Sequence, residues 1–122
     1  MELTKKGIEE RIKIKNDFVW YHFKNKKLDF SKIISIGGSA HLQGCSFNLS
    51  SLVSIGGFAY LYGCFSNLSS LVSIGGFADL QGCSKKLKKS LAKTLQKCDG
   101  IYVEFQDNSM TLDEFKKYAD KL

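Results

Sequence analysis

Proline is absent from this sequence of 122 residues, so neither a rigid linker nor a disordered proline-rich arm is expected. Long apolar runs are also absent, because glycine, serine or a charged residue interrupts each one well before the roughly 18 residues that a membrane-spanning helix needs. Met1 to Gly7 contains no apolar signal region. We therefore expect one cytoplasmic domain with no membrane partner, and the 43% of hydrophobic residues suffices for a core.

Basic residues are missing from the middle of the chain. Residues 1–32 carry nine Lys or Arg and five acidic residues, and residues 85–122 carry nine Lys and six acidic residues. Between them, residues 33–84 contain no basic residue and Asp79 as the one acidic residue. A neutral middle between charged ends is typical of a repeat array, whose ends need a polar outer surface. We divide the chain into an N-terminal cap at 1–18, repeats at 19–84 and a C-terminal cap at 85–122.

A short unit is repeated in this middle segment with a constant period of 19. Ser-Ile-Gly-Gly occurs at 35–38, 54–57 and 73–76, followed each time by Ala-x-Leu-x-Gly-Cys at 40–45, 59–64 and 78–83. A fixed period predicts that each unit stacks on its neighbours in order to bury its apolar side chains.

The segment Ala59-x-Leu61-x-x-Cys64 resembles the strand core of the leucine-rich repeat, L-x-L-x-x-N/C, and the resemblance covers about residues 19–94. It implies a mainly β repeat solenoid of short parallel strands, in which Ala and Leu point inward and the Cys positions form a ladder. The unit differs from the family in being shorter and in carrying Ala at the first Leu position. Between Cys64 and Ile74 there is no helical pattern, so we expect extended or single-turn structure there.

The repeat register predicts strands centred near Leu42, Leu61 and Leu80. A backward shift by one period adds a degenerate first unit, in which Trp20 to Lys24 forms a strand centred near Phe23, and Phe30 and Ile33 align with Leu49 and Leu52. We expect the Gly-Gly pairs to form the corner before each strand, because glycine adopts positive φ without steric cost.

The two charged ends are expected to cap the repeats. Lys85 to Cys98 predicts an amphipathic helix, Ile101 to Phe105 alternates as a half-buried strand does, and a capping box at Thr111 predicts a final helix from about Leu112 to Leu122. Residues 2–16 fit a short helix, which we favour, although Ile12-Lys-Ile14-Lys suits a strand.

Residues between the inward Ala and Leu positions point outward, because strand side chains alternate. Three outward columns result, namely Trp20, Ser39, Phe58 and Phe77; His22, His41, Tyr60 and Asp79; and Lys24, Gln43, Tyr62 and Gln81. Strands about 4.8 Å apart make these columns one patch, and contiguous exposed aromatic surface marks an interaction site. The candidate partner-binding residues are Trp20, His22, His41, Phe58, Tyr60, Tyr62, Phe77 and Asp79. The alternative is that the caps fold over this face and bury it.

Enzymatic and metal-dependent functions are not indicated. Cys45, Cys64 and Cys83 occupy the ladder position of the resembled family and are expected to be buried, reduced structural thiols, because three ligands in a straight file do not enclose a metal ion. His22, His41 and Asp79 lie on a flat face without pocket walls, and no phosphate loop or nucleophile motif is present. We expect neither a cofactor nor a metal.

The sequence therefore predicts a non-enzymatic binding module, an inhibitor or adaptor that engages a protein partner through the aromatic repeat face. The alternative is binding of nucleic acid or a ribonucleoprotein through a basic stripe on the cap helix, made of Lys85, Lys86, Lys89, Lys93 and Lys97. A compact Lys-rich protein of that kind would suit a phage counter-defence factor, such as an anti-CRISPR-like blocker of a guided nuclease. The two hypotheses differ in geometry, because nucleic-acid binding is favoured if stripe and aromatic face share a side.

Overall fold

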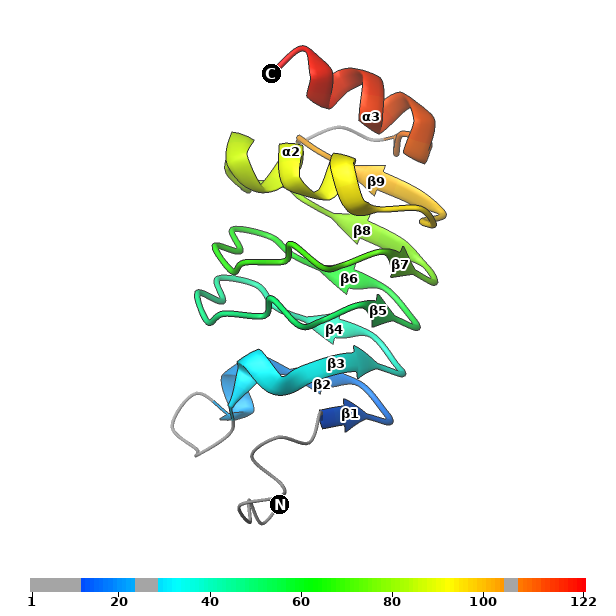
Figure 1. Ribbon diagram of the computed structural model, residues 1–122. Helices are drawn as coiled ribbons and strands as arrows, with labels where there is room; N and C mark the ends of the chain where they lie inside the picture. Colours follow the sequence, from blue (N-terminus) through cyan, green and yellow to red (C-terminus); the bar gives the residue numbers. More distant parts are fainter. Residues whose placement is uncertain (1–11, 24–28, 105–107) are drawn as a thin grey trace.

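The computed structural model describes residues 12–23, 29–104 and 108–122, which form two parallel sheets of short strands and two α-helices (Figure 1). The first sheet has the order β1-β3-β5-β7, with strands at Ile12–Ile14, Ile33–Ile36, Ser54–Ile55 and Ser73–Ile74. The second has the order β2-β4-β6-β8-β9, with strands at Phe18–Val19, Ala40–His41, Ala59–Tyr60, Phe77–Asp79 and Gly100–Tyr102.

Each repeat unit supplies one strand to each sheet, and we call such a unit a rung. The rungs stack in register, so that Ala40 pairs with Ala59 and Ala59 with Ala78. The parallel strands predicted near Leu42, Leu61 and Leu80 are thereby confirmed, with each strand ending just before its leucine, which is fully buried. Stacking of identical side chains builds the core, because every apolar column continues from one rung to the next.

The segments from Cys45 to β5 and from Cys64 to β7 are irregular rather than helical, and for the second of them this is the predicted structure. Cys45, Cys64 and Cys83 are buried and their thiols are free. Asn48 and Asn67 shape the turns that follow, since each side chain accepts a hydrogen bond from the backbone N–H two residues later, at 2.9 and 3.0 Å.

The predicted first strand at Trp20 to Lys24 is wrong. Trp20–Phe23 is a 3-10 helix, η1, and Lys24 lies outside the described residues. The first strand of the second sheet is instead β2, in which Phe18 pairs with Ala40. Phe18 and Ala40 are separated along the sequence by three residues more than the repeat period, because the segment between β2 and η2 (Phe30–Lys32) is longer than the corresponding segment of the later units.

The regular period holds again from Asp29 onward. Asp29 accepts a hydrogen bond from the Ser31 N–H at 3.0 Å, as Asn48 does from Ser50. Phe30 and Ile33 are buried at the positions of Leu49 and Leu52, which confirms that part of the predicted alignment.

The Gly-Gly corners do not use positive φ, which occurs among the described residues at Gly44, Gly63 and Gly82 after the strands of the second sheet. The corners need glycine because successive rungs approach closely there. A Cβ at Gly56 would lie 2.2 Å from the Gly37 carbonyl oxygen, and one at Gly75 would lie 2.0 Å from the Gly56 carbonyl oxygen. The predicted corners are present, but their expected cause was wrong.

The N-terminal helix favoured for residues 2–16 is wrong where the structure describes that segment, because Ile12–Ile14 forms β1 and pairs with β3. Its residues 2–11 lie outside the described part. β1 and β2 thus form a rung of both sheets within residues 12–19, ahead of the Ser-Ile-Gly-Gly repeats.

Helix α2 spans Lys85–Thr94 and ends four residues earlier than predicted. Leu95 is already extended, and the Gln96 N–H donates to the Val72 carbonyl oxygen at 2.7 Å, so the chain joins the edge of the first sheet. Cys98 consequently lies beyond the helix, partly buried against the core.

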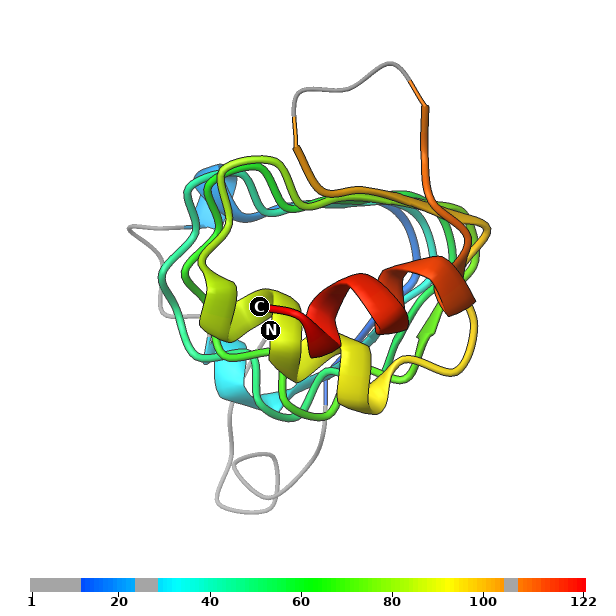
Figure 2. The same ribbon diagram turned by 90° about the horizontal axis from the view of Figure 1, so that it is seen from above.

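The chain then enters β9, which ends at Tyr102 rather than at Phe105, and Phe105 lies outside the described residues. Helix α3 covers Leu112–Asp120 and begins with the predicted capping box of Thr111 and Glu114. The two helices close the C-terminal end of the stack of rungs. α2 lies on the side of the stack opposite the second sheet (Figure 2). Among the described residues, no helix has the length and apolarity to cross a membrane.

Candidate functional site

The outer face of the second sheet carries most of the predicted binding residues. His41, Phe58, Tyr60, Phe77 and Asp79 all project from β4, β6 and β8 or from the residue before them. The His41 and Tyr60 rings stack, with centroids 4.7 Å apart and planes inclined by 18°. Tyr62, which is 46% exposed, follows β6 beyond the buried Leu61. The register therefore brings these side chains together.

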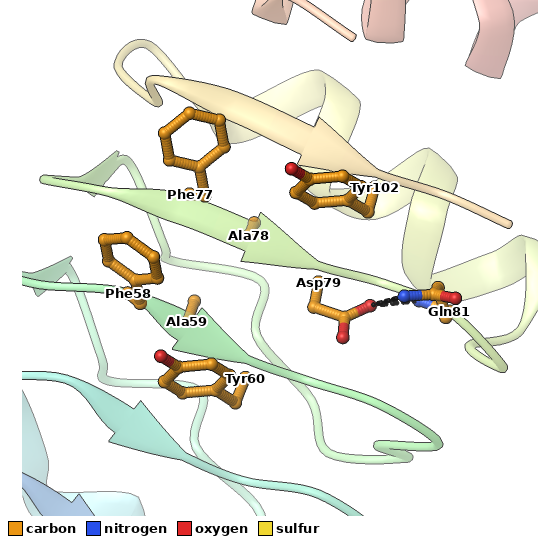
Figure 3. Close-up of a pocket in the computed structure, with 8 residues that line it drawn as sticks. All are labelled: Phe58, Ala59, Tyr60, Phe77, Ala78, Asp79, Gln81 and Tyr102. Atoms are coloured by element: carbon orange, nitrogen blue, oxygen red, sulfur yellow. Dashed lines mark hydrogen bonds between the residues drawn. The ribbon is translucent and has the colours of Figure 1, made fainter. Parts of the chain in front are cut away.

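Four aromatic rings on this face form what we call the aromatic arc, namely Tyr60, Phe58, Phe77 and Tyr102. Neighbouring ring centroids are 5.9, 5.7 and 6.1 Å apart in that order. Asp79 lies between the two ends of the arc, because it is the strand-pairing partner of Tyr60 on one side and of Tyr102 on the other. The arc and Asp79 surround a hollow of about 360 Å³ (Figure 3). Ala59, Ala78 and Gln81 also line it.

Glycine allows the two phenylalanine rings of the arc to lean across the sheet. A Cβ at Gly76 would lie 2.4 Å from Cδ1 of Phe58, and one at Gly100 would lie 2.6 Å from Cε2 of Phe77. Each ring thus occupies space that any larger residue on the next rung would fill. The second glycine of the corner consequently shapes the face as well as the turn.

Asp79 lies at the edge of the hollow with one carboxylate oxygen engaged. Its Oδ1 accepts hydrogen bonds from the Gln81 backbone N–H at 3.1 Å and from Gln81 Nε2 at 2.9 Å. Within the described part of the chain, no donor is bonded to Oδ2. Figure 3 shows the carboxylate between the rings of Tyr60 and Tyr102. The hollow therefore combines apolar walls with one negative charge.

Trp20 and His22 lie on η1 and not on a strand of this sheet, which corrects their predicted positions in the outward columns. Val19, rather than His22, pairs with His41. Trp20 is half-buried and packs against the core, and its Nε1 donates to the Gln43 carbonyl oxygen at 2.6 Å. The additional length of the first rung displaces both side chains.

Tyr102 was missed from the predicted site although its strand was expected. The repeat motif ends at Cys83. Ile101 of β9 pairs with Ala78, and their separation along the sequence is four residues longer than the repeat period, so an alignment at that period does not place Tyr102 beside Asp79. The sequence Gly100-Ile-Tyr contains a signal for this strand. Ile101 lies between Gly100 and Tyr102 in the same way as the inward Ala78 lies between Phe77 and Asp79.

Helices α2 and α3 do not cover the aromatic face in the described structure. Phe58 is 44% exposed, and Tyr60, Phe77, Asp79 and Tyr102 are half-buried by one another and by their neighbours on the sheet. α2 and α3 lie at the end and on the opposite side of the stack (Figure 2).

The predicted basic stripe lies mostly on α2. Lys85, Lys86, Lys89 and Lys93 are exposed on the helix, and Lys97 is exposed but follows it. Lys88, at 9% exposure, differs from these, because its Nζ lies 5.9 Å from the centre of the Tyr118 ring. α2 lies on the opposite side of the stacked rungs from the second sheet, whose strands carry the aromatic arc.

The cysteine thiols are suited to packing rather than to reaction. Burial raises the pKa of Cys45 and Cys64, and it raises the pKa of Cys83 to about 11. A thiol in this environment stays protonated near neutral pH, and the protonated form is a poor nucleophile and metal ligand. Among the described residues, no group of three or more His, Cys, Asp or Glu side chains could hold a metal ion.

Comparison of the chain with models of protein families, with curated proteins and with solved structures finds no match.

Proposed function

We propose that this protein is a cytoplasmic, non-enzymatic binding module, an inhibitor or adaptor that engages a protein partner through the aromatic face of the second sheet. We also propose that its stacked rungs form a β solenoid similar to the leucine-rich repeat. The observation that carries the functional proposal is the aromatic arc with its hollow, on a sheet face that the two α-helices leave uncovered.

The composition of the repeat supports the proposal. Inward positions hardly change from rung to rung, as in Ala40, Ala59 and Ala78, whereas the outward positions beside them change from His41 to Tyr60 to Asp79. Packing accounts for the constant positions, but the fold does not need four large rings beside solvent. Aromatic side chains of this kind supply much of the binding energy at protein interfaces.

The test is a comparison of two aromatic truncations. Tyr60→Ala removes a ring of the arc, while Phe65→Ala removes a ring of similar size that is 69% exposed outside the second sheet. Affinity capture from the native host identifies proteins held by the wild type and by Phe65→Ala, and their affinities are then measured with purified components. We expect Tyr60→Ala to weaken binding at least about 30-fold, the equivalent of about 2 kcal/mol. Equal affinity of the two variants would overturn the proposal.

The second candidate is nucleic-acid or ribonucleoprotein binding through the basic stripe, including the anti-CRISPR-like role. It is favoured by a hollow between α2 and α3 that Lys89, Lys93 and Lys116 line. However, Lys116 Nζ already donates to the Ala92 carbonyl oxygen at 2.8 Å, and α2, which carries most of the stripe, lies on the opposite side of the stack from the second sheet. That separation supports the protein partner.

Salt dependence distinguishes the two candidates. If the lysines hold phosphates, affinity for a single-stranded oligonucleotide falls steeply with salt, and changing Lys86, Lys89 and Lys93 together to Gln lowers the slope of log K against log[salt] by about two to three units. We expect the triple variant to keep its protein partner and to lose only solubility.

A further inference from the structure

Asp79 is the one charged residue between positions 33 and 84, and the rung geometry does not require its charge. The corresponding positions of the preceding rungs carry His41 and Tyr60. The backbone ladder is the same in each case, since the Leu61 N–H donates to the Asp79 carbonyl oxygen and the Leu80 N–H to that of Tyr102. The bonds from Gln81 to Oδ1 add a local turn contact, and no donor among the described residues is bonded to Oδ2.

The surroundings of this carboxylate are aromatic. Tyr60 and Tyr102 stand on the rungs before and after Asp79, two strand spacings or roughly 9.5 Å apart, with only the shorter aspartate between them. Phe58 and Phe77 close the opposite side of the hollow, as Figure 3 shows. Ring faces carry negative electrostatic potential, so the arc and the carboxylate attract the same sign of charge.

We propose that this hollow receives the guanidinium group of an arginine side chain presented by the protein partner, an inference that rests on the proposed function. The charge of the group is complementary to Asp79, and its N–H groups donate to Oδ2. A planar guanidinium stacks against aromatic rings and is more weakly hydrated than the ammonium group of lysine, which favours arginine in an apolar hollow. The hollow of about 360 Å³ is large enough for the side chain and the backbone that presents it.

The direct test uses a small probe and nuclear magnetic resonance. N-acetyl-arginine methylamide is titrated into the full chain, with N-acetyl-citrulline methylamide as the neutral probe of nearly the same shape. We expect shifts at the amides of residues 58–60, 77–81 and 101–102 with the arginine probe, and binding at least about fivefold weaker with citrulline. Equal binding of the citrulline or of a lysine probe would overturn the assignment, as would shifts produced instead by a neutral methyl glucoside.

Asp79→Asn is the decisive variant, because the amide oxygen can still accept the Gln81 hydrogen bonds while the charge is lost. We expect about tenfold weaker binding of the arginine probe, in line with the loss of a charge-assisted hydrogen bond at a partly solvated site. Asp120→Asn on α3 removes a charge away from the hollow and should change nothing. An unchanged affinity for Asp79→Asn, with an unchanged melting temperature, would overturn the inference.

The partner assay separates this inference from the proposed function. If Tyr60→Ala abolishes partner binding and Asp79→Asn does not weaken it, the aromatic face remains the interface and the arginine is excluded. If neither change weakens partner binding, the proposed function itself is wrong, whatever the probe does.

Discussion

The close approach of rungs at the Gly-Gly corners gives the sharpest prediction for the fold, which is that Gly56→Ala destabilises the protein far more than Gly44→Ala. A Cβ at position 56 would lie 2.2 Å from the Gly37 carbonyl oxygen, so the two rungs must separate by about 1 Å to restore contact distance. Two hydrogen bonds between rungs flank the contact, from Gly56 N to Ile36 O at 2.7 Å and from Gly57 N to Gly38 O at 2.9 Å. Their separation costs about 1 kcal/mol each.

Loosened packing of the buried Ile36 and Ile55 columns adds to this loss, so we expect a decrease of about 3 to 5 kcal/mol in the free energy of unfolding. Gly44 is the control, because a Cβ there meets nothing within 4 Å and only its φ of 68° is unfavourable for alanine. Its substitution should cost about 1 to 2 kcal/mol. Urea unfolding followed by the fluorescence of Trp20 measures both values. A loss for Gly56→Ala no larger than for Gly44→Ala would refute the close-approach explanation of the Gly-Gly corners.

Two further predictions concern the core. Leu61→Ala should lower the free energy of unfolding by roughly 2 to 5 kcal/mol because it opens a cavity at a fully buried position. Tyr60→Ala, next to it on the outer face, should shift the melting temperature by only a few degrees. A Tyr60→Ala variant that fails to fold would show that the face is part of the core. Burial raises the pKa of Cys83 to about 11, so above about pH 9 the folded thiol stays neutral while the unfolded thiol ionises. The free energy of unfolding should therefore decline between about pH 9 and pH 11 by roughly 3 kcal/mol in total, with no effect below about pH 8. Urea unfolding at pH 7.5 and pH 10 should therefore show a smaller alkaline loss for Cys83→Ala than for the wild type, and identical losses would contradict the assigned cause.

The regular rungs could be predicted from the sequence because their period determines the pairing. Once Ala40, Ala59 and Ala78 are aligned, parallel register places Leu42 and its equivalents inside and His41, Tyr60 and Asp79 outside, with no need for local propensity. Local propensity alone would not have identified strands of two residues.

The two ends could not be predicted in the same way, because there the chain keeps the geometry of a rung while changing its length. Phe18 and Ile101 continue the column of Ala40 and Ala78, at offsets that exceed the repeat period by three and four positions. A search at a fixed period misplaced Trp20 and His22 and omitted Tyr102 for this reason. A search for the spacing of Ile14 and Phe18, which matches that of Ile36 and Ala40, would have found the first rung.

Stacking by single rungs also has a consequence for how the chain folds. The strand pairings of the second sheet join residues one repeat unit apart, or a few positions more at the ends, so each new rung closes a loop of similar, modest entropy. Folding can therefore propagate one rung at a time from whichever end nucleates, and a growing end always presents unpaired strand edges until a cap arrives. At the C-terminal end β9, α2 and α3 supply that cap, which makes residues 85–122 the segment whose arrival terminates growth and protects the completed stack from pairing with a second copy.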